Sequence, residues 1–167
     1  MDREDLIRSH LIELLSGGDA HMSFAEAIAD FPLNFANRRA PNMPYTPWHI
    51  LEHMRINQWD IVEFIRNPNH VSPKWPQGYF PSPKAKTDKA GWQKTIDGFR
   101  ADLEVLINLA KDPNTDLFAP IPHAADYTIY RQILLSADHN AYHIGEFAFM
   151  RQVMKTWPSS KVLYDAE

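Results

Sequence analysis

The sequence predicts an all-α protein, a four-helix bundle with one short extra helix. Four long segments carry apolar residues at helical spacing, and no segment shows the alternation of apolar and polar residues that is typical of a strand. Two proline-rich stretches separate the later helical segments, and we interpret them as long crossover connections. A chain of 167 residues is one domain of ordinary length, which we assign to residues 1–167.

The first part of the chain predicts one long and one short helix. Leucine and isoleucine recur at helical spacing over residues 3–15, and a Gly-Gly pair then ends the helix. Ser23 and Glu26 form a capping-box pattern, in which each side chain bonds the backbone N–H at the other position. We therefore expect a short helix from Phe24 to about Asp30, before the next proline.

The second long helix has the clearest start signal in the chain. Thr46 can cap the free backbone amides, and Pro47 at the first helical position costs no hydrogen bond. We expect this helix to run to Asn67, because the next residue is proline. Residues 68–87 contain five prolines and three large aromatic residues, which predicts a stiff loop with aromatic anchors. Loops of this length are often functional.

Two more long helices complete the predicted fold. Thr87 or Asp88 can cap the third, whose apolar positions recur until Pro113. A second proline-rich loop follows. The fourth helix is expected to extend from near Thr128 to about Thr156, roughly 40 Å at 1.5 Å per residue.

Composition excludes several classes of function. The net charge is −4 and the 17 basic residues are scattered, so we expect no nucleic-acid partner. Because the chain has no cysteine, disulfides are excluded and a bound metal must take nitrogen or oxygen ligands. The first residues are charged, and no apolar run approaches the roughly 20 residues that a membrane span needs. We therefore expect a cytoplasmic protein with no membrane partner.

Three histidines form the candidate metal site. His139 and His143 lie four residues apart in the fourth helix, which places both rings on one helix face. Such a pair alone is more often hydrogen-bonded to the backbone or to carboxylates than metal-bound. His53 lies among apolar residues of the second helix, at a core-facing position, and favours the metal interpretation. Together the three imidazoles can bind a transition metal inside a helix bundle.

One face of the fourth helix is apolar at both ends and polar in the middle. Five buried polar groups without partners would cost on the order of a few kcal/mol each, so a ligand, water or other side chains must compensate. The residues of this face are Ile129, Gln132, Ser136, His139, His143, Glu146, Met150 and Val153.

Glu146 is the candidate catalytic residue. It lies about one turn beyond His143, where a carboxylate can orient a ligand ring or a metal-bound water. It can equally pair with Arg151 or with a basic residue of another helix. Tyr142 is interpreted as packing. The tryptophans are interpreted as core or loop anchors, although one or two can form the wall of a substrate pocket.

A second histidine pattern allows a different interpretation. The segment from His49 to His53 matches the H-x-x-E-H pattern of a class of zinc proteases, with Glu52 as the base. This interpretation leaves the pair in the fourth helix unexplained, and we expect His49 either to contact one of the three candidate histidines or to lie at the rim of the site. The remaining four histidines lie at loop or surface-like positions and are expected to be solvated: His10, His21, His70 and His123.

Two segments of the chain resemble the DinB-like proteins. They are Thr46-Pro47-Trp48-His49-Ile50-Leu51-Glu52-His53-Met54 and Ala137-Asp138-His139-Asn140-Ala141-Tyr142-His143-Ile144-Gly145-Glu146. The resemblance covers nearly the whole chain and extends to Asp60, to the loop 118–123 and to Arg151. It implies an up-down-down-up four-helix bundle that is often dimeric, so a homodimer is expected. It also implies that the metal triad falls on the three histidines of the candidate site.

Two functions are left open by the sequence. The first is a metal-dependent hydrolase or thiol-dependent transferase that acts on a small-molecule substrate. Zinc and nickel lead the candidate metals, and iron and manganese also suit three imidazoles with open positions. Since the chain has no cysteine, a low-molecular-weight thiol would come from outside. The second is a non-catalytic, metal-stabilised bundle that acts in dimerisation or partner binding, and it predicts a closed coordination sphere.

Overall fold

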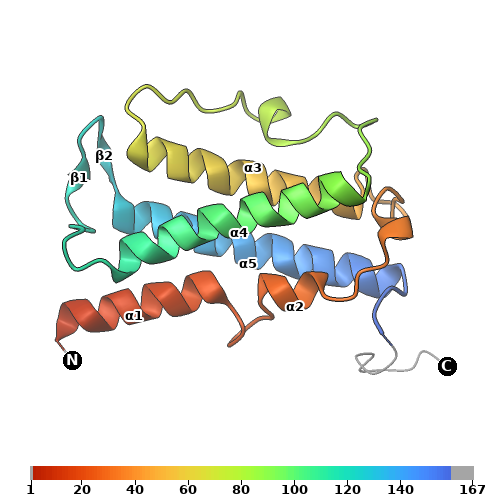
Figure 1. Cartoon of the computed structure of the whole chain (residues 1–167), viewed down its shortest axis with the longest axis horizontal. Coiled ribbons are helices and arrows are strands. Elements are labelled where there is room, and N and C mark those ends of the chain that lie inside the picture. Colours follow the sequence, from red (N-terminus) through yellow and green to blue (C-terminus); the bar gives the residue numbers. More distant parts are fainter. Residues whose placement is uncertain (1, 159–167) are drawn as a thin grey trace.

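The computed structural model describes residues 2–158 (Figure 1). This part of the chain is mostly helical with one small two-stranded sheet, which confirms the all-α class. In chain order the elements are α1 (Arg3–Ser16), α2 (Phe24–Ile28), the 3-10 helix η1 (Leu33–Phe35), α3 (Pro47–Arg66), the 3-10 helix η2 (Gln77–Tyr79), α4 (Lys89–Lys111), β1 (Pro120–Ile121), β2 (Ala124–Thr128) and α5 (Ile129–Val153).

The four long helices lie side by side. In Figure 1, α1 and α5 run in one direction along the long axis, and α3 and α4 run in the opposite direction. Both α3 and α1 pack against α4 and against α5. The short α2 lies beyond the end of α1 and packs on α5. Every long helix therefore buries one face against two others, as an amphipathic helix requires.

Local signals in the sequence define the helix starts. The side chain of Thr46 accepts a hydrogen bond from the backbone N–H of His49, and Asp88 rather than Thr87 caps α4. Two helices end earlier than expected, α2 at Ile28 and α5 at Val153. The backbone is already extended after Ile28, and it becomes left-handed two residues after Val153, which stops both helices.

The two proline-rich connections have different structures. Residues 67–88 return along α3 to the start of α4, as a crossover connection does (Figure 1). The connection between α4 and α5 instead joins neighbouring helix ends through the hairpin of β1 and β2. The expectations of a second crossover and of no strands were therefore wrong. β1 has only two residues and none of the five residues of β2 is buried, which explains why the sequence shows no alternation of apolar and polar residues here.

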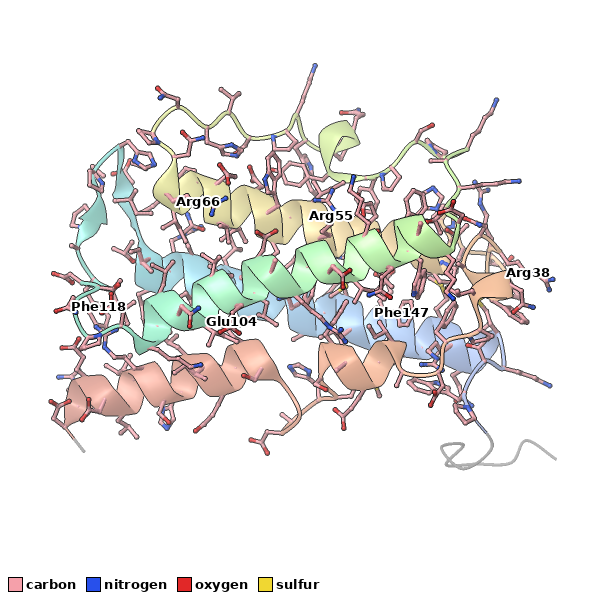
Figure 2. The ribbon with its side chains drawn as sticks, viewed as in Figure 1. Arg38, Arg55, Arg66, Glu104, Phe118 and Phe147 are labelled. Carbon is pink, nitrogen blue, oxygen red and sulfur yellow. The ribbon has the colours of Figure 1, made fainter. Side chains whose placement is uncertain are left out.

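A polar layer divides the core into two apolar clusters. Phe147, labelled on α5 in Figure 2, belongs to the cluster that includes α2, and Leu11 belongs to the one that includes α1. Between them, the side-chain nitrogen of Gln58 donates to the backbone carbonyl of Phe99 at 2.6 Å. The side-chain oxygen of Gln58 accepts from Asn140 at 2.8 Å. The polar residues in the middle of α3 and α5 are thus partly compensated by each other.

Hydropathy along the helices is low. Within residues 2–158, none of the helices combines the length and the apolar composition that crossing a membrane requires.

Candidate metal centre

The three candidate histidines meet between α3 and α5. The Nε2 atom of His53 lies 3.2 Å from Nε2 of His143 and 3.1 Å from Nε2 of His139. One ring nitrogen from each residue lies within 4.8 Å of the others. The predicted convergence of the three residues is therefore confirmed. Helical spacing brings the α5 pair onto one face, and packing of α3 against α5 adds the third ring.

Hydrogen bonds fix the orientation of two of the rings. Nδ1 of His53 lies 2.8 Å from the backbone carbonyl of Tyr79, which can only accept, so this nitrogen carries the proton. Nδ1 of His143 likewise donates to Oε2 of Glu146 at 2.7 Å. In the neutral rings, both Nε2 atoms then present lone pairs to each other. Two lone pairs at 3.2 Å repel each other, and a cation between them removes the conflict.

The third ring has no partner for its other nitrogen. Nδ1 of His139 is buried and makes no hydrogen bond with any described residue. Burial and the neighbouring His143 and His53 lower the pKa of His139 to about 3. Burial also lowers the pKa of His53. These two rings are therefore neutral at physiological pH, the form in which imidazole binds a metal.

The donor set fits a transition metal. Imidazole nitrogens at about 2.0–2.1 Å from one ion lie about 2.8–3.4 Å from each other in octahedral or tetrahedral geometry, and the two Nε2 distances of His53 fall in that range. Among residues 2–158, this group of histidines includes no carboxylate. Three imidazoles alone leave at least one coordination position open for water or a substrate.

Glu146 supports His143 rather than joining the ligands. One carboxylate oxygen accepts from His143, and the other accepts from the hydroxyl of Tyr45. Burial opposes ionisation of Glu146, but the hydrogen bonds from His143 and Tyr45 outweigh it, so the pKa is lowered. The suggested pair with Arg151 is wrong, because that guanidinium bonds backbone carbonyls near α2 instead.

The crossover loop covers one side of the site. The ring of Phe80 stacks on His53 with centroids 3.9 Å apart and an interplanar angle of 5°. The hydroxyl of Tyr79 donates to Asp60 at 2.6 Å, while its carbonyl holds His53. His70 also bonds Asp60, at 2.6 Å, and its side chain is only 7% exposed. The expectation of a solvated His70 was therefore wrong: the loop folds this ring against α3.

The residues of the second histidine pattern, from His49 to His53, do not form a zinc site of the protease type. His49 is buried, and it bonds Thr46 through Nδ1 and the carbonyl of Ser82 through Nε2. It serves as a helix cap and a loop anchor, not as a rim residue. Glu52 bonds Arg55 and Thr95, away from the three histidines. The protease interpretation thus lacks both its second ligand and its base.

The structure also shows where the aromatic residues considered for the site lie. Trp92 is a core residue, as expected, whereas Trp75 is 66% exposed. Tyr142 is 70% exposed and touches His143 with its ring edge-on, so it packs only against the site's outer side. Tyr45 was missed and Phe80 was expected only as an aromatic anchor of its loop, because nothing in their local sequence indicates contact with α5 or His53.

The site is interpreted from its own residues. Searches against protein-family models, curated proteins and solved structures found no match to this chain.

The neutral histidines predict that stability depends on pH. Unfolded histidine takes up a proton near pH 6.5, whereas His53 and His139 resist it in the folded chain. Protonation therefore favours unfolding as the pH falls below about 6.5, by up to about 1.4 kcal/mol per pH unit for each residue. We expect chelator-treated protein to lose free energy of unfolding from about pH 7 to about pH 5 in urea titrations.

A matched pair of variants isolates this effect. His139→Asn should flatten the pH dependence, and His10→Asn, which changes an exposed histidine, should not. If the free energy of unfolding depends on pH equally in the wild type and in His139→Asn, the assignment of His139 as a neutral ring in the folded chain is contradicted.

Proposed function

We propose that the protein is a DinB-like, divalent-metal-dependent enzyme, a hydrolase or a thiol-dependent transferase. The observation that carries the proposal is the convergence of three Nε2 atoms, two of them oriented by Nδ1–H bonds to Tyr79 and Glu146. The helix directions and contacts support an up-down-down-up four-helix bundle as the scaffold.

The proposed metal is zinc or nickel, with iron and manganese as alternatives. When bound, such an ion supplies a positive charge that ionises water or a low-molecular-weight thiol at neutral pH. The chain supplies orientation. Glu146 holds the His143 ring, the Tyr79 carbonyl holds the His53 ring, and Phe80 shields one face of His53 from water.

An enzyme is favoured over a purely structural metal site. A structural site is coordinatively closed, usually by four protein ligands. The described residues bring three histidines together with no carboxylate among them, and Glu146 is committed to His143 and Tyr45. The open position is what a substrate or thiol requires.

Metal reconstitution tests this proposal. Chelator-treated protein is loaded separately with zinc, nickel, iron(II) or manganese, and bound metal is measured after gel filtration. We expect a single ion per chain and, with the correct metal, hydrolysis of an activated ester or transfer of an added thiol above the metal-free level. Failure to retain any of the four ions would reject the proposal. Retention without any activity would favour the structural role.

We further propose that the protein is a homodimer through the outer face of α5. Tyr142 and Phe149 are each 70% exposed, and Val153 is 41% exposed. Offsets of seven and four residues place them on one face of the helix. Gly145, between the two aromatic residues, has open space around its Cα and permits close approach of a second copy. The mass in solution, measured by light scattering, tests this part of the proposal.

A further inference from the structure

A groove of about 310 Å³ lies between α3 and α5, and none of the three histidines lines it. Residues of α3, η2, β2 and α5 line it together with Trp75. Its walls combine aromatic rings, among them Trp75, Tyr79 and Tyr127, with the polar side chains of Arg131 and Gln132. Its volume is near the lower end of the range for small-molecule sites, about 300–1,000 Å³. The groove therefore suits a small ligand.

Two adjacent polar side chains in the groove lack protein partners. The guanidinium of Arg131 lies 4.8 Å over the ring of Tyr127, and no described residue forms an ion pair with it. Gln132 is only 4% exposed, and its amide makes no hydrogen bond with any described residue, but solvent in the groove reaches the amide. A ligand in the groove can therefore replace water as the hydrogen-bond partner of this amide.

The other charged group of the groove already has hydrogen-bond partners. Asp60 receives one hydrogen bond from Tyr79 and another from His70, one on each carboxylate oxygen. Asp60 therefore closes the groove wall, while Arg131 and Gln132 offer unused donors at the other wall. A guanidinium and an amide that line one groove can both donate hydrogen bonds to a carboxylate, and the guanidinium can do so through two parallel N–H···O bonds.

The groove extends to within one helical turn of the histidines. Asn57 follows His53 by four residues, and Leu135 precedes His139 by four, so both lining residues lie on the ligands' own helix faces. Tyr79 belongs both to the groove, which it lines, and to the histidine site, where its backbone carbonyl accepts a hydrogen bond from His53. Eight residues from Arg131 to His139 correspond to about 12 Å along α5.

We propose that this groove binds an elongated, apolar carboxylic acid. Its carboxylate pairs with Arg131 and Gln132, its apolar body lies along Tyr127 and Trp75, and its far end points to the three histidines. This inference rests on the proposed function for the reaction at the far end, because it names the substrate class of that site. Binding of the acid itself depends only on the groove.

Calorimetric titration of octanoate into chelator-treated protein tests the proposal. We expect a single site with at least about tenfold weaker binding of 1-octanol, which has the same chain without the charge. Arg131→Gln should weaken octanoate binding about tenfold and leave octanol binding unchanged. Arg100→Gln, a matched change of an exposed arginine on α4 outside the groove, should alter neither.

Further measurements separate this inference from the metal site. Trp75→Leu should remove the change in tryptophan fluorescence that octanoate produces, since Trp75 is an exposed tryptophan of the groove. Equal binding of octanoate and octanol, no binding of octanoate, or an unchanged affinity in Arg131→Gln would overturn the proposal. Octanoate binding in a chain that retains no metal would leave the groove assigned and reject only the metal-dependent function.

Discussion

Replacing His53 with alanine is expected to lower the affinity for the metal by more than about 100-fold. His53 is the central ligand, because its Nε2 lies 3.1 and 3.2 Å from the nitrogens of the other two rings. Without it, only the two imidazoles on α5 remain. His139→Ala should have a similar effect. The measurement is bound metal after gel filtration, together with the dissociation constant from competition with a chelating dye.

His49→Ala is the decisive control for this prediction. His49 belongs to the same helix and to the alternative zinc pattern, but its two ring nitrogens already bond Thr46 and Ser82. The substitution His49→Ala should therefore lower the free energy of unfolding, while the folded protein keeps its metal. Circular dichroism confirms which variants are folded. Stoichiometric metal in folded His53→Ala, or full metal loss in folded His49→Ala, would refute the assignment of the site.

The helices could be predicted from sequence because their signals are local. The cap at Thr46, the proline after Asn67 and the apolar period of α4 each act within a few residues. The group of three histidines could also be predicted, because a spacing of four residues fixes His139 and His143 relative to each other. Their encounter with His53 required only that α3 and α5 be neighbours.

The residues around the triad could not be predicted in the same way. Tyr45, Tyr79 and Phe80 lie in segments whose path depends on tertiary contacts, not on a repeating pattern. His70 illustrates the difficulty, since a loop histidine is ordinarily solvated and this one is buried by its bond to Asp60. The three histidines that converge could be identified from the sequence, whereas the residues that orient their rings could be identified only from the structure.

On the polar face of α5, some of the polar groups have the hydrogen-bond partners that the sequence predicts and others do not. Ser136 bonds Gln58 of α3, and His143 bonds Glu146, as the cost of burial requires. Nδ1 of His139 is not compensated, because it is buried and makes no hydrogen bond with any described residue. Gln132 also makes no hydrogen bond with any described residue, but its amide lines the groove and solvent reaches it there.

The second large effect is expected for Arg151. Arg151→Met should lower the free energy of unfolding by about 3 kcal/mol. The Arg151 guanidinium donates to the carbonyls of Ala27 and Ala29 at 2.6 and 2.8 Å and to that of Thr156 at 3.0 Å. It also lies 3.7 Å from the ring centroid of Trp157. Methionine fills the space but leaves these three carbonyls without their donor, so the attachment of α2 to α5 is weakened.

Urea denaturation followed by circular dichroism measures this loss. Arg100→Met, on the exposed side of α4, is the matched control and should change stability by less than about 0.5 kcal/mol. Arg151→Lys keeps the charge but not the planar fork of donors, so an intermediate loss is expected. The folded variants should still bind the metal, because Arg151 touches none of the three histidines or Glu146. A loss below about 1 kcal/mol for Arg151→Met would mean that the guanidinium contributes little to holding α2 on α5.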